Sequence, residues 1–229
     1  MSETDEIKRL LLLSTPAQRQ EIFSYLRKEF PIHPLEAKLN TEAEIILAVI
    51  ERSAGLTLRM IRGVIAEAAF EIDVVLRLSA WSNVTPSGDL PYDFRLDDGV
   101  GAVRVQVKLQ RSLAHRPMMA NQAYRFLPAD MFVVETQRTR KGSDPTGGST
   151  RPYRFGEFDV LAVAMHPSTN KWDTFMYTVA DWLLPALDNP SNLLKFQPVA
   201  PTPNDDWTDD FFEVVNWFRS ATKKTICGR

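Results

Sequence analysis

Cysteine is almost absent from this chain, whose 229 residues contain a single one, Cys227. One cysteine excludes an intramolecular disulfide and leaves no set of thiolates for a structural zinc site. The three histidines, His33, His115 and His166, also lack the spacing of zinc ligands. The protein must therefore fold and act without a disulfide framework or a cysteine-based metal cage.

Long apolar runs are missing as well, and none approaches the roughly 18 residues that would span a bilayer. The acidic opening Met-Ser-Glu-Thr-Asp-Glu lacks the basic region of a signal peptide. The sequence also contains no Gly-rich phosphate loop of the Walker type. We therefore expect a soluble intracellular protein that is not driven by ATP.

The size of the chain is sufficient for a full hydrophobic core, since 229 residues carry 44% hydrophobic residues. We expect one compact core with a helical appendage. The predicted boundary separates a helical N-terminal region, residues 1–56, from a core with a C-terminal helix, residues 57–229. The N-terminal region is expected to serve dimerisation or contact a ligand.

Charge is unevenly distributed in a chain whose net charge is −2. Residues 101–156 hold ten Lys and Arg against three Asp and Glu, whereas residues after 156 are acidic overall. A basic strip inside an acidic chain is typical of a cleft that binds a polyanion, although a solvated basic face would have the same composition.

Helix-capping signals occur before the core. Thr15 followed by Pro16 is typical of an N-cap and first helical position, and Thr41 with Glu44 three residues later resembles a capping box. Gly55 is expected to end the second helix.

A longer helix is predicted after that glycine, with Thr57 as its N-cap and apolar residues recurring at spacings of three and four. This helix carries Glu67 and Glu71, one turn apart on the same face.

Alternating polarity predicts a β-hairpin from residues 92–96 and 102–109. We predict an α/β fold with a central mixed sheet of four to five strands, helices on both faces and a helical N-terminal region. The remaining predicted elements are strands at 131–135, 158–165 and 172–179, a long loop at 139–152, a short helix at 182–187, a linker at 198–203 and a closing helix at 208–221.

The hairpin brings reactive side chains to one surface. Val103, Val105 and Val107 point into the core, so Gln106 and Lys108 share the opposite face. If the hairpin loop contains an even number of residues, Asp93 lies across from Gln106.

An acid, an amide and an ammonium on one face suit metal-assisted phosphodiester hydrolysis. A hard cation such as Mg²⁺ prefers carboxylate and carbonyl oxygens, which Asp93 and the backbone of Val107 would provide. Lys108 would orient or deprotonate the attacking water and offset charge on the phosphate.

The segments Pro91-Tyr92-Asp93 and Gln106-Val107-Lys108 together resemble the signature of the PD-(D/E)xK nucleases, with glutamine at the middle acid. The helix that carries Glu67 is similar to the first core helix of that family, which often supplies another acid. The resemblance implies a restriction-endonuclease-like core. It also implies a bacterial, cytoplasmic type II restriction endonuclease that cuts double-stranded DNA as a homodimer with Mg²⁺. It also implies Glu67 as an additional catalytic and metal-binding residue.

Residues 1–56 are expected to form a dimer interface or to contact DNA. Polar and basic side chains around the hairpin and the long loop are the other expected DNA contacts. They are Arg104, Gln110, Arg111, Asn121, Arg138, Arg140, Lys141, Arg151 and Arg154.

Several alternatives remain open. Glu71 could replace Glu67, and Asp89 could replace Asp93. The chain could be a repair or structure-selective nuclease of the same fold, or a DNA-binding protein without activity in which Gln106 marks a lost metal site. It could also be a scaffold whose Asp93, Gln106 and Lys108 are ordinary surface residues.

Overall fold

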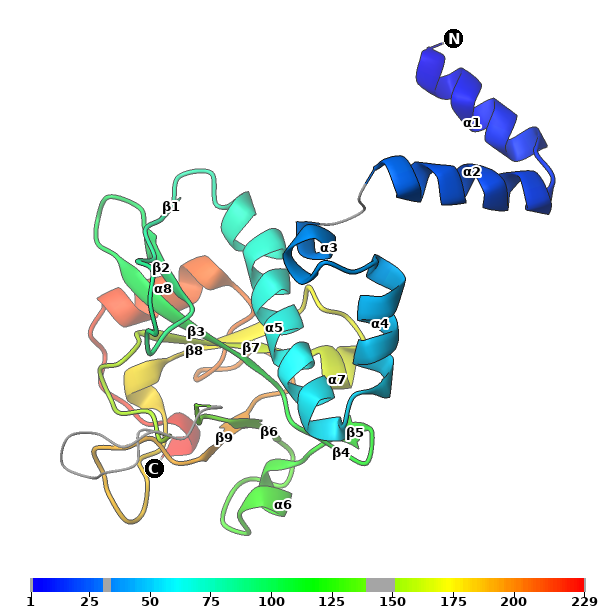
Figure 1. Ribbon diagram of the computed structural model, residues 1–229. Coiled ribbons are helices and arrows are strands. Elements are labelled where there is room, and N and C mark those ends of the chain that lie inside the picture. Colours follow the sequence, from blue (N-terminus) through cyan, green and yellow to red (C-terminus); the bar gives the residue numbers. More distant parts are fainter. Residues whose placement is uncertain (1, 31–33, 139–150, 229) are drawn as a thin grey trace. The chain divides into compact units, whose positions relative to one another are not determined.

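The computed structural model describes residues 2–30, 34–138 and 151–228. The chain divides into two compact units, residues 1–58 and residues 59–229. Figure 1 labels their helices and strands. Each unit is described by itself below.

The first unit is entirely helical in its described part. Its helices are α1 (Glu3–Leu13), α2 (Pro16–Glu29), α3 (Pro34–Leu39), α4 (Ala43–Arg52) and the start of α5 (Gly55–Asp73). The predicted cap of α2 is confirmed, because the Thr15 hydroxyl accepts the Gln18 amide at 3.3 Å and the Gln18 side chain accepts the Thr15 amide at 2.9 Å.

Two predicted helix boundaries are wrong. The N-cap of α4 is Glu42 rather than Thr41, and the Glu36 carboxylate accepts the Ala43 amide at 2.8 Å in place of a local cap. Gly55 begins α5 instead of ending α4, which leaves Thr57 inside the helix. A side chain seven residues away took the capping role, and sequence spacing alone does not reveal such a contact.

The second unit is built on a mixed five-stranded sheet, as predicted. Its strand order is β1-β2-β3-β7-β8, and only β3 and β7 are parallel. The strands are β1 (Ser82–Asn83), β2 (Phe94–Asp97), β3 (Val103–Leu109), β7 (Val160–Ala164) and β8 (Phe175–Val179).

The predicted hairpin has the register that places Asp93 across from Gln106. Phe94 pairs with Val105, so the residues just outside this pair face each other. The Asp97 carboxylate accepts the amide of Gly99 at 2.8 Å, and Gly99 has a φ of 84°, a conformation that favours glycine. The turn therefore fixes the register on which the site depends.

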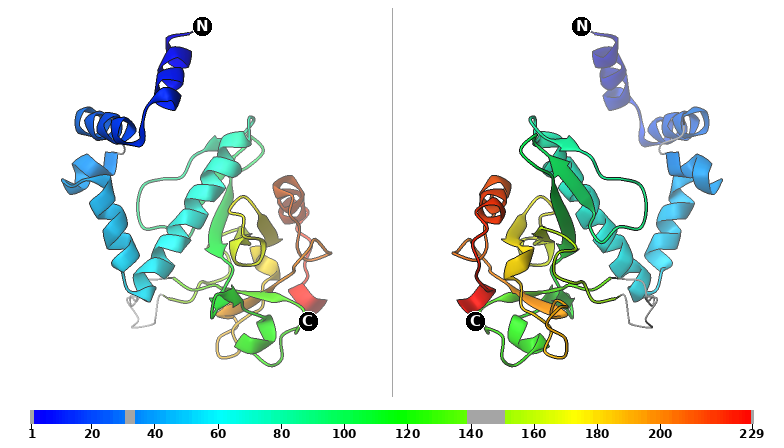
Figure 2. Two further views of the ribbon diagram at one scale, coloured as in Figure 1. Left: turned by 90° about the vertical axis from the view of Figure 1, so that its right-hand side faces the viewer. Right: turned by 90° about the vertical axis from the view of Figure 1, so that its left-hand side faces the viewer.

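Aromatic rings join the helices to the sheet. Phe70 of α5 is fully buried, and its ring centroid lies 5.3 Å from that of Phe94, 5.5 Å from Phe175 and 6.1 Å from Phe211 of α8 (Phe211–Arg219). Both views in Figure 2 show α5 running alongside the strands. This packing holds the face of α5 that includes Ala66 and Phe70 in the core.

Smaller elements complete the unit. They are the turns η1 (Val75–Arg77), η2 (Ala180–Trp182) and η3 (Ile226–Gly228), the strands β4 (Ser112–Leu113), β5 (Arg116–Pro117), β6 (Phe132–Glu135) and β9 (Phe196–Val199), and the helices α6 (Ala120–Ala123) and α7 (His166–Thr169).

The predicted short helix at 182–187 is wrong, and the predicted linker at 198–203 is wrong at its first two residues, which lie in β9. Leu184 accepts the amide of Leu194 at 2.8 Å, and the buried Gln197 side chain bonds both backbone groups of Leu184. These bonds hold the segment extended, and Pro198 lies inside β9, paired with Val133 of β6.

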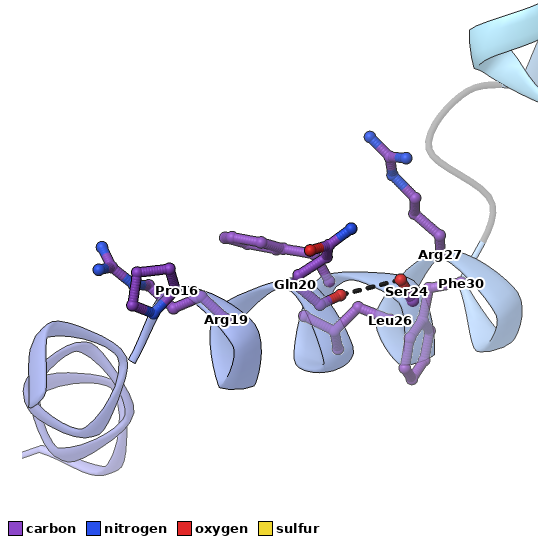
Figure 3. Close-up of a pocket in the computed structure, with 8 residues that line it drawn as sticks. Pro16, Arg19, Gln20, Ser24, Leu26, Arg27 and Phe30 are labelled. Carbon is purple, nitrogen blue, oxygen red and sulfur yellow. Dashed lines mark hydrogen bonds between the residues drawn. The ribbon is translucent and has the colours of Figure 1, made fainter. Parts of the chain in front are cut away.

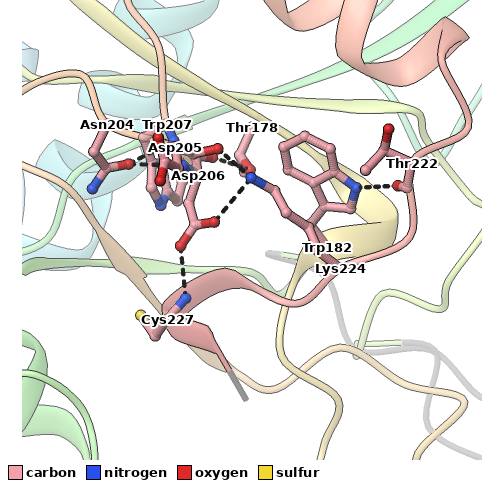
Figure 4. Close-up of polar contacts among 9 residues, drawn as sticks. All are labelled: Thr178, Trp182, Asn204, Asp205, Asp206, Trp207, Thr222, Lys224 and Cys227. Carbon is pink, nitrogen blue, oxygen red and sulfur yellow. Dashed lines mark hydrogen bonds and ion pairs between the residues drawn. The ribbon is translucent and has the colours of Figure 1, made fainter.

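The C-terminal segment is fastened to the core by Lys224 (Figure 4). Its ammonium lies 4.0 Å from the centroid of the Trp182 ring and 3.1 Å from the Asp206 carboxylate. Trp182 Nε1 donates to Thr222 at 2.7 Å, and the Asp206 carboxylate accepts the amide of Cys227 at 2.8 Å.

Within the described ranges, none of the helices is both long enough and apolar enough to cross a membrane.

Candidate active site

The candidate site lies where β2 separates from β3. The amide of Asp93 donates to Val105 at 3.0 Å, which is the last backbone bond between the two chain segments here. Two residues after Val105 on β3, the amide of Val107 donates to the Asp93 carboxylate at 2.7 Å. The Asp93 side chain thus takes the place of the next backbone partner of β3, and this bond keeps its carboxylate against the backbone of β3.

Gln106 connects the two oxygens that the sequence predicts as metal ligands. Its side chain is 2% exposed, and Nε2 donates to the Asp93 carboxylate and to the Val107 carbonyl, the latter at 3.1 Å. Both oxygens therefore converge on one point, at which the amide nitrogen now lies. Reversing the amide would turn a third oxygen, Gln106 Oε1, toward the other two.

Glu67 approaches this group from α5. The pKa of the Glu67 carboxyl is raised to about 7: burial is the largest cause, the charge of Asp93 also raises it, and the charge of Lys108 lowers it. Asp93 and Lys108 are thus its electrostatic neighbours, although 26 and 41 residues separate them from Glu67 in the sequence. The structure brings together all four side chains that the sequence singles out.

Asp93 experiences the same environment. Burial raises the pKa of its carboxyl, while the charge of Lys108 and the hydrogen bond from Val107 lower it. Burial disfavours the anionic form of both Asp93 and Glu67, and the two carboxyls share the ammonium of Lys108 as a compensating charge. Such a pair gains from any further cation that enters between them.

Tyr153 is a site residue that the sequence did not predict. Its ring is 4% exposed, and the Lys108 ammonium lies 5.1 Å from the ring centroid. A contact across 45 residues, with a long predicted loop between, leaves no periodic signal in the sequence. Its place directly after a basic segment was the one available indication.

The two alternative acids lie outside this group. Asp89 is exposed in an irregular segment before β2, and Glu71 is exposed one turn beyond Glu67 on α5. Neither is an electrostatic neighbour of Asp93 or Glu67 in the way that Lys108 is. The geometry therefore favours Asp93 and Glu67.

Two predicted DNA contacts, Arg104 and Gln110, bond other parts of the protein. The guanidinium of Arg104 bonds both oxygens of Asp159, at 2.6 and 3.0 Å, and the Gly156 carbonyl at 2.7 Å. Gln110 is 1% exposed, and its side chain accepts the amide of Ser168 at 3.1 Å. The buried Gln110 cannot contact DNA in this conformation, whereas the paired Arg104 side chain stays 34% exposed. Strand alternation in the sequence did not reveal either set of partners.

The other predicted contacts remain partly accessible where they are described. Arg111 pairs with Glu135 at 3.3 Å, and Arg138 pairs with Glu157 at 2.8 Å. Asn121 and Arg154 are exposed, and Arg151 is partly buried. Arg140 and Lys141 lie outside the described residues, as does most of the predicted loop at 139–152.

Comparisons with known proteins give little further information. No family model matches the chain, and no curated protein matches it. Among solved structures the chain is similar to a bacterial homing endonuclease, I-Ssp6803I, with a TM-score of 0.36 and 18% identity over 70% of this chain and 89% of that one. A likeness this weak carries no argument about this protein, whose candidate site rests on its own geometry.

Proposed function

We propose that this protein is a Mg²⁺-dependent endonuclease that hydrolyses phosphodiester bonds of double-stranded DNA. The observation that carries the proposal is the convergence of the Asp93 carboxylate and the Val107 carbonyl on one point, with Lys108 and Glu67 beside it. The proposal identifies this group with the PD-(D/E)xK signature that the sequence resembles.

The oxygens present fit a hard divalent cation. Asp93, Val107 and a reversed Gln106 amide would supply three oxygens, and Glu67 could supply a fourth. In the described part of the chain, no three His, Cys, Asp or Glu side chains gather as a metal site. Ligands must therefore include backbone and amide oxygens with water, a set that Mg²⁺ accepts more readily than zinc does.

When bound, Mg²⁺ would polarise the scissile phosphate and lower the pKa of an attacking water. Lys108 would offset the negative charge that grows on the phosphate, and its ammonium would orient that water. Asp93, fixed by the Val107 amide, would keep the ligand oxygen in place. Glu67, whose raised pKa of about 7 leaves it partly protonated at neutral pH, would release that proton as its carboxylate becomes a ligand.

The finer form of the proposal is a bacterial type II restriction enzyme acting as a homodimer. The local surplus of basic residues between 101 and 156 supports a DNA partner. The first unit supports self-association, because α1, α2 and α4 bury no residue and Leu12, Leu13 and Leu47 are 82%, 70% and 65% exposed. An open hollow along α2, lined by Phe23, Leu26 and Phe30 among others, adds apolar surface (Figure 3).

The test is incubation of the purified protein with unmodified plasmid and genomic DNA, in Mg²⁺ or in EDTA. Discrete fragments in Mg²⁺ alone are expected, and Asp93→Ala and Lys108→Ala should each abolish them. Asp89→Ala is the matched control, because that exposed acid should leave cleavage unchanged. Cutting that survives Asp93→Ala would disprove the assigned site.

A second candidate is a DNA-binding protein without catalytic activity. The neutral Gln106, whose amide nitrogen bonds both predicted ligand oxygens, is the observation that favours it. DNA binding that depends on salt but neither on Mg²⁺ nor on Asp93, together with intact DNA, would support this candidate. A repair or structure-selective nuclease would instead cut without discrete sites.

A further inference from the structure

The segment that follows the predicted long loop returns to the candidate site at Tyr153. The ring of Tyr153 meets that of Phe158 edge to face, with centroids 5.4 Å apart and planes at 87°. Its backbone carbonyl accepts the amide of Leu193 at 2.8 Å. Ring and backbone are both fixed, so Tyr153 presents a rigid surface to whatever lies against it.

Two cations lie against this ring. Lys108 Nζ is 5.1 Å from the ring centroid, and the guanidinium carbon of Arg138 is 5.4 Å from it. Glu157 pairs with Arg138 at 2.8 Å and offsets that second charge. The remaining ammonium, that of Lys108, faces the carboxyls of Asp93 and Glu67.

A lysine needs such an anchor if it is to act at a defined point. Its four-carbon stem rotates freely, and a phosphate in the site would compete with Asp93 for its charge. The face of an aromatic ring attracts an ammonium without neutralising it, and the attraction increases when both are shielded from water. An aromatic anchor therefore fixes the position of the cation and keeps its full charge.

The phenol hydroxyl contributes a second contact. Burial raises the pKa of Tyr153, whereas the charge of Lys108 and a hydrogen bond with it lower that pKa. A phenol that keeps its proton at neutral pH remains a neutral partner for the ammonium, and does not become a competing anion beside Asp93.

We infer that Tyr153 is a positioning residue that holds the Lys108 ammonium over the candidate site through its ring face and hydroxyl. The inference rests on the proposed nuclease function and deepens it. It adds a residue outside the hairpin, supplied by the chain segment that follows the basic loop, to the machinery that Asp93, Gln106 and Lys108 form.

The variants that test it are Tyr153→Leu, which removes the ring, and Tyr153→Phe, which keeps the ring and removes the hydroxyl. Tyr124→Leu is the matched control, since that partly buried tyrosine stacks on Phe126 at 5.3 Å and lies outside the site. Thermal melts of all variants establish that each is folded. If Tyr153→Leu fails to fold, Tyr153→Phe still reports on the hydroxyl contact.

The first readout is the NMR signal of the Lys108 ε-methylene, assigned by its loss in Lys108→Met. The ring current of Tyr153 should shift this signal in the wild type and in Tyr153→Phe, whereas Tyr153→Leu should return it to the position of a solvated lysine. The second readout separates chemistry from binding. Tyr153→Leu should lower the single-turnover cleavage rate about tenfold and leave DNA affinity, measured with Ca²⁺ in place of Mg²⁺, within about twofold. Tyr153→Phe should lower the rate less.

A Lys108 signal at the same position in Tyr153→Leu as in the wild type would overturn the inference, as would a rate loss no larger than that of Tyr124→Leu. If folded Tyr153→Leu loses DNA affinity and cleavage in equal measure, the ring serves binding and the inference is wrong. A wild-type protein that cuts no DNA would overturn the proposed function and the role in cleavage together. The Lys108 signal would then still show whether the contact exists.

Discussion

Glu67 and Asp93 place two carboxyls in a partly buried region that supplies one compensating ammonium, Lys108. The third position, where the resembled signature has an acid, is the neutral Gln106. A glutamine there spares the metal-free fold a third buried negative charge and still offers a carbonyl oxygen. The residue that weakens the match to the signature thus reduces the electrostatic strain of the site.

Glu67→Gln should stabilise the metal-free protein at high pH and leave it unchanged at low pH. The ordinary pKa of this carboxyl is 4.5, and the folded value is about 7. Below pH 4.5 the Glu67 carboxyl is neutral in the folded and in the unfolded chain, so it does not lower the free energy of unfolding. Between pH 4.5 and about 7 only the folded chain keeps the proton, so the free energy of unfolding falls as pH rises. Above both pKa values the folded chain must hold the buried carboxylate, and the loss of stability is complete.

The expected gain is about 2 to 3 kcal/mol in the free energy of unfolding at about pH 8, falling to near zero at about pH 4.5. Urea titrations in EDTA measure it. Glu71→Gln, one turn along the same helix and exposed, is the control and should change little at either pH. A gain in Glu67→Gln that does not vary with pH would contradict the pKa assigned to this residue.

Among the elements, β3 carries Gln106, Val107 and Lys108 of the candidate site, and its two neighbouring strands run in opposite directions. It pairs antiparallel with β2 and parallel with β7. Arg104 of β3 stabilises the pairing with β7, because its guanidinium donates to the Asp159 carboxylate and to the Gly156 carbonyl. Asp159 is 9% exposed. A shift between β3 and β7 would move Gln106 and Lys108, so this ion pair maintains the site.

Asp159→Ala should lower the free energy of unfolding by about 1 to 3 kcal/mol, because it leaves the guanidinium of Arg104 without its carboxylate in a partly buried place. Chemical denaturation measures the change. The double variant Arg104→Met with Asp159→Leu should recover part of the loss, since apolar side chains replace the pair. Equal stability of Asp159→Ala and wild type would show that the pair adds nothing.

The hairpin could be predicted from the sequence, because strict alternation and a turn glycine determine the faces and the register of neighbouring strands. The start of α4 could not, because the capping group is the distant Glu36. The partners of Arg104 and Lys108, Asp159 and Tyr153, were equally hidden, since each arrives through a segment far along the chain. Local patterns located the reactive groups, and long-range contacts determine what surrounds them.

At the scale of the whole molecule, the two units differ in how they are stabilised. The second contains the buried aromatic cluster around Phe70, whereas α1, α2 and α4 of the first bury no residue. The predicted role of residues 1–56 in dimerisation or DNA contact stays a prediction. It has a simple test, because α5 begins at Gly55 and a cut before it spares that helix.

Deletion of residues 2–53 should leave the rest of the protein folded, with a melting temperature within a few degrees of the full chain, because the core is retained. Sedimentation velocity should show a dimer for the full chain and a monomer for the shortened one. Fragment patterns should change from double-strand cuts to nicks if one subunit cuts each strand. A shortened protein that still dimerises would place the interface in residues 54–229.

The parallel pairing of β3 with β7 also has a consequence for the order of folding. Arg104 and Asp159 meet across 55 residues, whereas β2 and β3 are joined by a short turn. A hairpin closes within microseconds, but closing a long loop onto a parallel strand is slower. Asp93, Gln106 and Lys108 would therefore assemble early as the chain leaves the ribosome. The ring of Tyr153 would reach Lys108 later, so the candidate site would be completed last.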